Sequence, residues 1–432
     1  MSRQDTARIP NLRHLAATAA VVQRGSISQA ARAIHLSQPA ITQAIAKLET
    51  ALGNPLFERG RHGMAPTPAG AQFAARIIRA QDWLKAGERT FTTAPALHRL
   101  ASTVHLRALI AAVEHRGFSS SARALGLAEQ SIHRAIRDLE ALCGQPLFLR
   151  TPHGLDPTHE ARALARAAGL AFAEIRQGMD EVREALGFMD GRIVIGCLPL
   201  ARTHLLPASL TRLLAQFPEV QARVIDGPYS ELLHGLRHGQ IDLIIGALRE
   251  PAPAADIRQD VCFSEPLRIA VRAGHPILAT PSPGLEQLAA LDWIVPREGT
   301  PARAHFANFF AAAGLPAPHR IIECSSLVAA RGLLLQSDRA AILSLSQIRY
   351  EILSGQLAVL AQPLPGSNRP IGLTLRKDWK PTRVQSALLE RIAEVVSEDS
   401  EAHGAFAHGL EEAGAQPGGA EAGAGGDADG LF

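Results

Sequence analysis

Amide and hydroxyl side chains line the outward face of a helix that the sequence predicts directly after Ser37. The apolar residues of this helix recur at helical spacing and form one stripe for burial: Ile41, Ile45, Leu48 and Leu52. The residues left pointing outward are Gln38, Thr42, Gln43 and Lys47. Side chains of these types reach base edges in the major groove of DNA, and glutamine can hold adenine with two hydrogen bonds. A solvated face on an ordinary helix is the alternative explanation.

The residues around this helix favour DNA binding over that alternative. Ser37 can cap the helix, and Pro39 is tolerated in its first turn. A short helix across residues 30–34, with Ser28 as its cap, is predicted before it, and "PLFER", "GRHG" and "MAPT" predict a strand, a turn and a returning strand after it. This hairpin carries side chains that suit the phosphate backbone: Arg59, Arg61 and His62. Helix–turn–helix followed by a two-stranded wing is a DNA-docking shape.

The same pattern occurs a second time, 91 residues later. The matching residues are Ile41, Ala44, Ile45, Leu48 and Glu49 in the first copy and Ile132, Ala135, Ile136, Leu139 and Glu140 in the second. Upstream, the alignment places Gly25 on Gly117 and predicts that one residue is missing just after Gly117. Two copies indicate a duplicated domain rather than a solenoid.

The outward face of the second copy is different. Ala128 replaces the cap Ser37, which costs the helix about 1 kcal/mol. The candidate DNA contacts of this copy are Glu129, Gln130, His133, Arg134 and Arg137 on the helix and Arg150 and His153 on the wing. Two interpretations stay open: a second reader with another base preference, or a folded spacer. The first copy is predicted to be the main base reader, although the second copy adjoins the downstream domain.

From Gly191 onward, short apolar strands alternate with helices, which predicts a mostly parallel, doubly wound α/β sheet. Ligands of such sheets lie beyond the carboxyl ends of the strands, often against helix N-termini. Nine residues take such positions and are the candidate ligand contacts: Leu198, Arg202, Thr203, Tyr229, Ser230, Arg297, Thr300, Ser325 and Ser326. Their arginines and hydroxyls favour a small polar or anionic ligand. Ordinary helix caps and surface arginines are the alternative.

The segment "GSISQAARAIHLSQPAITQAIAKLETALGNPLFERG" resembles the N-terminal signature of LysR-type transcriptional regulators, and the resemblance covers most of the chain. It implies a winged helix-turn-helix domain and a two-lobed effector-binding domain similar to periplasmic solute-binding proteins, with the effector bound between the two lobes. It also implies that the long helix beginning at Thr158 is a dimerisation element, with packing inside one chain as the alternative. The family usually carries one DNA-binding domain, whereas this chain carries two.

These predictions divide the chain into seven segments. They are a flexible N-terminus (1–10), winged helix-turn-helix copy 1 (11–66), a linker helix (67–103), copy 2 (104–157), a linker or dimerisation helix (158–190), the effector-binding domain (191–397; lobe I 191–265 and 362–397, lobe II 266–361) and a disordered acidic Gly/Ala-rich tail (398–432).

Composition argues against several other classes of protein. No apolar run is long enough to span a membrane, and the N-terminus does not resemble a signal peptide, which predicts a cytoplasmic protein. The eight acidic residues from Glu398 onward, with no Lys or Arg among them, leave the rest of the chain more basic than its net charge of +3 suggests, which suits an anionic partner. The four cysteines lack CxxC spacing and the 17 histidines lack an HExxH motif, so we expect no metal and no cofactor.

We therefore predict a ligand-responsive, sequence-specific transcriptional regulator. Its expected partners are double-stranded DNA, a small-molecule effector and further copies of itself as a dimer or tetramer, with RNA polymerase as a further candidate. A ligand-binding module with only non-specific or structural DNA association is the alternative. An enzyme on the α/β domain is less favoured, because the sequence shows no P-loop, Rossmann fingerprint or nucleophile elbow.

Overall fold

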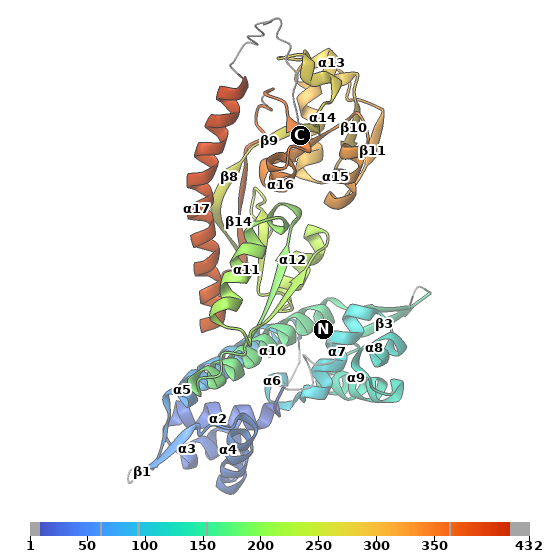
Figure 1. The fold of residues 1–432 in the computed structure, drawn as a ribbon. Helices are drawn as coiled ribbons and strands as arrows, with labels where there is room; N and C mark the ends of the chain where they lie inside the picture. Colours follow the sequence, from blue (N-terminus) through green and yellow to red (C-terminus); the bar gives the residue numbers. More distant parts are fainter. Residues whose placement is uncertain (1–8, 61–62, 93–95, 153, 363, 415–432) are drawn as a thin grey trace, which may run out of the picture. The chain divides into compact units, whose positions relative to one another are not determined.

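A computed structural model describes residues 9–60, 63–92, 96–152, 154–362 and 364–414 (Figure 1). The chain divides into two compact units, each with its own sheet and core. The first is built from residues up to Cys262 together with Ile371–Ile392, and the second from Phe263–Pro370 and the residues from Ala393 onward. No helix within the described ranges is long and apolar enough to cross a membrane.

The first winged helix-turn-helix domain begins the first unit. It consists of α2 (Leu12–Arg24), α3 (Ile27–Ile34), α4 (Gln38–Leu52) and an antiparallel hairpin of β1 (Phe57–Gly60) and β2 (Gly63–Pro66). Ser37 caps α4 as predicted, and its hydroxyl accepts a hydrogen bond from the Ala40 amide at 3.3 Å. The predicted cap and start of the short helix were wrong, because Ser26 rather than Ser28 is its N-cap. Gly25 turns the chain in the left-handed conformation, so the extended Ser26 already accepts a bond from the Gln29 amide.

The second domain repeats these elements without a gap. It consists of α7 (Thr103–His115), α8 (Phe118–Leu125), α9 (Glu129–Cys143), β3 (Phe148–Thr151) and β4 (Gly154–Pro157), each shifted by 91 residues from its equivalent. The predicted missing residue was therefore wrong. Arg116, with φ of 48°, takes the left-handed position of Gly25, and Gly117 stands at the N-cap position of Ser26. The alignment had matched the two glycines because left-handed helix ends favour that residue.

The glutamate repeated in both copies holds the wing to the recognition helix. The carboxylate of Glu49 accepts hydrogen bonds from the amides of Leu56 at 2.8 Å and Phe57 at 3.2 Å. Glu140 accepts the equivalent bond from the Leu147 amide at 2.8 Å. This role in the fold explains why the residue is the same in two copies whose outward faces differ.

A long helix follows each domain, and the two helices pack against each other. They are α5 (Pro68–Glu88) and α10 (His159–Ala185), and they lie side by side along much of their length (Figure 1). A short helix, α6 (Leu97–Leu100), lies in the connection between the two copies. Within this chain the apolar face of α10 packs against α5, as the alternative of packing inside one chain expects, and the predicted role of α10 in pairing two chains stays a prediction.

The rest of the first unit is a mixed sheet in the order β6-β5-β7-β14-β8. Its strands are β5 (Arg192–Cys197), β6 (Gln221–Ile225), β7 (Leu243–Ala247), β8 (Ile257–Glu265) and β14 (Arg369–Arg376). Strand β5 pairs in parallel with β6 and β7, whereas β14 is antiparallel to β7. The helical elements are η1 (Pro199–Arg202), α11 (Leu205–Gln216) and α12 (Tyr229–Arg237). The chain leaves this unit through β8 and returns through β14.

The second unit holds a second mixed sheet, in the order β11-β10-β12-β9-β13. The strands are β9 (Leu267–Arg272), β10 (Asp292–Val295), β11 (Ile321–Glu323), β12 (Arg339–Ser344) and β13 (Leu357–Val359). The helical elements are η2 (Pro276–Ala279), α13 (Leu285–Ala289), α14 (Pro301–Ala311), α15 (Leu327–Gln336), η3 (Leu345–Gln347) and α16 (Arg349–Leu353). The rings of Trp293, Phe306 and Phe310 meet edge to face in its core, which fixes β10 against α14.

The last helix, α17 (Arg383–Gly414), extends past residue 398, where the sequence predicts a disordered tail to begin. Residues 398–414 contain glutamate and alanine, which favour helix, and no proline. Asp399 pairs with Arg349 at 2.8 Å. The start of the predicted tail was therefore placed too early, and residues 415–432 lie outside the described ranges.

The two recognition helices differ at their caps, and this difference predicts a stability effect. Ala128 has nearly the same backbone angles as Ser37 but no side-chain acceptor. Replacing Ala128 with Ser should therefore supply the missing cap and stabilise α9 by about 1 kcal/mol. Slower hydrogen exchange of the amides in the first turn of α9 would show this. Ala141→Ser, on an exposed part of the same helix, is the control, and equal effects of the two changes would contradict the prediction.

Candidate nucleic-acid interface and ligand-binding loops

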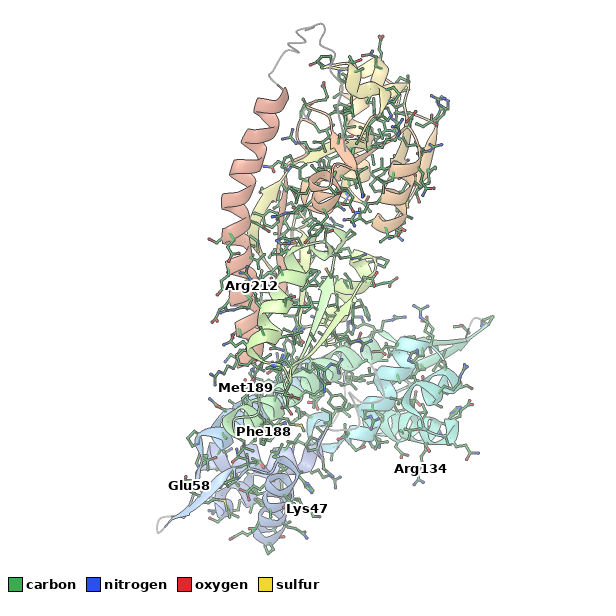
Figure 2. All side chains as sticks on the ribbon, in the orientation of Figure 1. Lys47, Glu58, Arg134, Phe188, Met189 and Arg212 are labelled. Carbon is green, nitrogen blue, oxygen red and sulfur yellow. The ribbon has the colours of Figure 1, made fainter. Side chains whose placement is uncertain are left out.

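The outward face of α4 presents side chains that are not engaged elsewhere. Gln38, Pro39, Gln43 and Lys47 are exposed. Within the described ranges, the side chains of Gln38, Gln43 and Lys47 make no hydrogen bond to the protein, and Lys47 projects outward from α4 (Figure 2). Thr42 is half-buried and its hydroxyl donates to the Gln38 carbonyl at 3.1 Å. The two glutamines are therefore the side chains best placed to exchange water for base edges.

A histidine behind this face stays neutral. Burial, and then the nearby Lys47 ammonium, lower the pKa of His14 below its ordinary value. At pH 7 the positive charge at this point therefore belongs to Lys47, which is the group suited to a phosphate.

The equivalent face of α9 is partly engaged by its own domain. The Ser119 hydroxyl donates to the Glu129 carboxylate at 2.6 Å, and the His133 ring lies 4.1 Å from the ring of Phe118. Arg134 is 83% exposed, and its Nε lies 3.9 Å from a carboxylate oxygen of Asp138 (Figure 2). Gln130 and Arg137 are also exposed. Because Asp138 stands at the position of Lys47, the two copies present different charges to a partner.

The wings carry the remaining predicted DNA contacts. Arg59 lies on β1 and Arg150 at the equivalent position on β3. The other three predicted wing residues, Arg61, His62 and His153, lie outside the described ranges.

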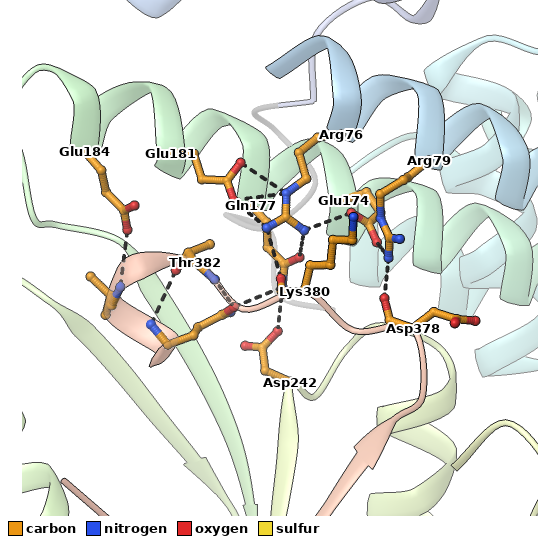
Figure 3. Close-up of polar contacts among 12 residues, drawn as sticks. Arg76, Arg79, Glu174, Gln177, Glu181, Glu184, Asp242, Asp378, Lys380 and Thr382 are labelled. Carbon is orange, nitrogen blue, oxygen red and sulfur yellow. Dashed lines mark hydrogen bonds and ion pairs between the residues drawn. The ribbon is translucent and has the colours of Figure 1, made fainter. Parts of the chain in front are cut away.

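A buried ionic cluster, which we call the Arg76 cluster, joins α5 and α10 (Figure 3). The guanidinium of Arg76 donates to Glu174 at 3.0 Å, to Gln177 at 3.0 Å and to Glu181 at 3.1 Å, all on α10. Arg79, one turn further along α5, pairs with Glu174 at 2.8 Å. Sequence reasoning missed this cluster, although the helical spacing of Arg76 and Arg79 and of Glu174, Gln177 and Glu181 could have suggested it.

The Arg76 cluster also reaches the effector-binding domain. Arg76 donates to the carbonyl oxygen of Lys380 at 2.9 Å, and Arg79 donates to that of Asp378. Gln177 donates to Gln385 at 3.3 Å. Residues 377–382 connect β14 to α17, so the helix pair is bonded to the loop that follows the returning strand.

Arg76 remains charged in this setting. Its side chain is 5% exposed, and burial acts to lower the pKa of its guanidinium. Hydrogen bonds and charge attraction from Glu181 and Glu174 outweigh burial and hold the pKa above its ordinary value. Loss of this cation would leave Glu181 without its partner and Glu174 with Arg79 alone.

The candidate ligand contacts of the first unit follow β5 and β6. Leu198 is buried, and Arg202 donates to the Cys197 carbonyl through two nitrogens at 3.1 Å each. Thr203 follows η1, and Ser230 is exposed in the first turn of α12. Tyr229 lies beneath the guanidinium of Arg249, which is 4.6 Å from its ring centre and which the sequence analysis did not single out. The hydrogen bonds of Arg202 to the Cys197 carbonyl therefore stabilise the conformation of the loop after β5.

The candidate contacts of the second unit gather at one edge of its sheet. Strands β10 and β11 are parallel neighbours, so Arg297 and Thr300, after β10, share an edge with Ser325 and Ser326, after β11. Thr300 caps α14 and Ser326 caps α15, as the alternative of ordinary caps predicts, whereas Arg297 and Ser325 are exposed. Two helix N-termini and an exposed arginine therefore meet at this edge, an arrangement suited to an anion.

Two helix-turn-helix domains with wings and a strand–helix domain with polar loops define a DNA-binding regulator with a ligand-binding domain. Comparison with known proteins agrees. Residues 12–71 and 103–162 each match the family described as "Bacterial regulatory helix-turn-helix protein, lysR family", and residues 186–397 match "LysR substrate binding domain". The chain therefore belongs to the LysR family of transcriptional regulators, and it is a DNA-binding regulator rather than an enzyme.

Some similar proteins match nearly the whole of this chain, and others match about two thirds of it. The HTH-type transcriptional regulator GalR of Pseudomonas putida is 35% identical over 395 residues, which cover 91% of this chain and 99% of that protein. The part of this chain outside the match is shorter than one winged helix-turn-helix domain, so GalR aligns with residues of both domains. PcaQ of Agrobacterium fabrum is 28% identical and covers 68% of this chain and 94% of its own length. Among solved structures, CbnR, described as a LysR family transcriptional regulator, has a TM-score of 0.47 at 21% identity and covers 68% of this chain and 98% of its own.

The Arg76 cluster predicts a large cost for a single substitution. Arg76→Ala should destabilise the α5–α10 pair by about 3–5 kcal/mol, because it leaves the largely buried Glu181 without a partner and Glu174 with Arg79 alone. Lys85→Ala is the matched control, since Lys85 pairs with Asp82 at 3.0 Å while 44% exposed, and exposed pairs contribute little. Hydrogen exchange of α5 and α10 measures both variants. Equal protection of these helices in the two variants would contradict the assigned role.

Proposed function

We propose that this regulator reads its operator mainly through α4 and responds to a small polar or anionic metabolite bound at the strand ends of its effector-binding domain. The observation that carries the first part is the capped α4 helix with exposed, unengaged Gln38 and Gln43. Family membership supports a cytoplasmic protein that acts as an oligomer and contacts RNA polymerase when bound to DNA.

The effector class is proposed from the loops of the second unit. Arg297 supplies an exposed cation, and the N-termini of α14 and α15 point positive partial charge to the same edge of the sheet. Hydroxyls of Ser325 and Ser326 can donate further hydrogen bonds, whereas the hydroxyl of Thr300 already donates to the Arg297 carbonyl at 2.8 Å. A carboxylate or phosphate group is the ligand chemistry that these groups complement.

The route between the two functions is proposed to run through the Arg76 cluster. Strand β14 carries the chain from the second unit into the first and leads directly into residues 377–382, whose carbonyl oxygens accept from Arg76 and Arg79. A ligand that shifts β14 would therefore change the support of the two helices that carry the reading domains.

Base reading by α4 predicts a change of specificity. Gln43→Ala should relax base preference at one position of the operator and cost about 1–3 kcal/mol on the preferred sequence, because a paired contact to adenine is lost. Arg59→Ala should weaken binding to all sequences alike and reduce the salt dependence, as loss of a phosphate contact does.

Competition binding on operator and point-mutated operators measures these effects. Thr50→Ala, on the exposed side of α4 near its end, is the control and should leave preference unchanged. Unchanged preference in both Gln38→Ala and Gln43→Ala would overturn the assignment of α4 as the reader.

The proposed anion site predicts a loss of ligand affinity. A panel of small mono- and dicarboxylates can be screened by tryptophan fluorescence in a chain with Trp83 and Trp379 changed to Phe, which leaves Trp293, four residues before Arg297, as the reporter. For a carboxylate that binds, Arg297→Ala should raise Kd about tenfold or more, because a charge-assisted hydrogen bond contributes about 1.5–3 kcal/mol.

Arg320→Ala is the matched control. Arg320 is also exposed and pairs with Asp292, but it precedes β11 and so belongs to the opposite strand ends. Equal Kd values for the two variants would rule out an anion site at Arg297.

A further inference from the structure

The two DNA-binding domains are joined by a helix pair whose contacts repeat under the 91-residue offset. An added Cβ at Gly87 on α5 would lie 2.7 Å from the Cβ of Ala167 and 3.3 Å from Leu164, both on α10. An added Cβ at Gly178 on α10 would lie 2.8 Å from Phe73 and 2.9 Å from Arg76, both on α5.

These four contacts are two copies of one contact. Gly178 is the equivalent of Gly87, Leu164 that of Phe73, and Ala167 that of Arg76. Gly87 of α5 thus contacts α10 in the same way as its equivalent, Gly178 of α10, contacts α5. Such reciprocal contacts are typical of a two-fold interface between identical subunits. The same contacts show that the helices are antiparallel, since the end of α5 meets the beginning of α10. The packing is therefore that of a dimer, formed here inside one chain.

We propose that one chain is a complete two-headed DNA-binding unit and that it binds a site composed of two unlike halves. Copy 1 takes the place of one subunit of a symmetric dimer, and copy 2 takes the place of the other. The pairing of α5 with α10 is inferred from their contacts alone. The difference between the two half-sites also depends on the proposed function of α4 as a base reader.

The charges show why the pair forms between α5 and α10 rather than between two identical helices. Arg76 is buried against Glu174, Gln177 and Glu181 of α10. The equivalent of Arg76 in copy 2 is Ala167. The equivalents of Glu174 and Glu181 in copy 1 are Trp83, on α5, and Thr90, two residues past its end. A pair of two α5 helices would bury arginines without carboxylates. A pair of two α10 helices would bury carboxylates without a cation. Either penalty is several kcal/mol per unpaired buried ion, so only the mixed pair is satisfied.

The apolar faces of both helices are already used in this mixed pair. On α5 the buried residues include Phe73, Ile77, Ala80 and Leu84. On α10 they include Leu164, Ala168, Phe172 and Ile175. These side chains belong to one continuous core that also contains residues of both reading domains. The two domains are thus held by one core and not by a flexible tether.

The equivalent positions on the two recognition helices predict how the half-sites differ. Gln43 corresponds to Arg134, and Gln38 to Glu129. Glutamine favours adenine, arginine favours guanine, and glutamate accepts from the amino group of cytosine. The half bound by copy 1 should therefore be richer in adenine at the positions where the half bound by copy 2 has guanine and cytosine.

A disulfide tests whether the helix pair forms within one chain. Gly87→Cys and Ala167→Cys together place two Cβ atoms 2.7 Å apart, and an opening of about 1 Å brings them into the range of a disulfide. The full chain carrying both changes is oxidised and run on a denaturing, non-reducing gel, with each single change as a control. The expected result is a band at the mass of one chain in which both introduced thiols resist alkylation until a reductant is added. Cross-linked protein at twice that mass, absent from the controls, would show that α5 pairs with α10 of another chain and would overturn the proposal.

Selection of bound DNA from a random pool tests the unlike halves. The full chain should recover a motif of two different halves. A variant with Gln38, Thr42 and Gln43 changed to Ala should lose the preference of one half, and a variant with Glu129, His133 and Arg134 changed to Ala that of the other. A motif of two identical inverted halves, or a second variant that selects the same motif as the unchanged protein, would overturn the proposal.

The two proposals fail in distinguishable ways. If the unchanged protein recovers no motif, base reading by α4 is refuted while the disulfide result still decides the helix pairing. If a motif is recovered and only the first variant alters it, α4 is confirmed as the reader and copy 2 is a spacer.

Discussion

The burial of one guanidinium between two helices is the constraint on which the arrangement of the first unit depends. Arg76 is nearly inaccessible to water, and its charge is offset only where Glu174 and Glu181 of α10 face it. Because an unpaired buried ion is so costly, this interaction selects the partner of α5 and sets how the two helices align. The reading domains follow, since each is continuous in sequence and in core with one of these helices.

This constraint gives the duplication a physical meaning. Two domains related by a 91-residue shift retain the apolar skeleton and the wing-holding glutamate, and so retain one fold. Because the two copies are separate stretches of one chain, their sequences can differ. The two helices of the interface differ in charge, and the two recognition helices differ in the side chains they present. A symmetric dimer cannot make either change on one side alone. The contact of the Arg76 cluster with the loop after β14 adds a path by which the effector-binding domain can influence both reading domains at once.

Much of this architecture could be predicted from the sequence, because local rules decide it. The stripe of Ile41, Ile45 and Leu48 and the cap Ser37 defined α4, and alternation of strands and helices defined the α/β domain. The family and the duplication were likewise accessible from the repeated segment. The register near Gly117 was predicted wrongly, since a glycine was taken to mark the left-handed residue that Arg116 supplies. The end of α17 was also misplaced, because composition alone does not show that a preceding helix can continue.

The remaining features depend on contacts between distant parts of the chain. The helical spacing of Arg76 and Arg79, and of Glu174, Gln177 and Glu181, places each set on one face of its helix. That the two faces are buried against each other follows from the packing of α5 on α10. The same holds for His133, whose position on the recognition helix suggested a DNA contact and whose ring lies against Phe118. The sheet edges were predicted, but the engagement of Arg202 by its own loop was not.

Pairing of the reading domains within one chain is tested most directly by pulsed dipolar spectroscopy on a chain labelled at positions 85 and 162. Both side chains are exposed, and they lie near the contact between the end of α5 and the beginning of α10. The labelled chain is unfolded and refolded with an excess of unlabelled chain, in a background from which the native cysteines have been removed. A short distance whose signal depth is unchanged by this dilution is the predicted result. A signal that falls in proportion to the dilution would show pairing between chains and would contradict the account.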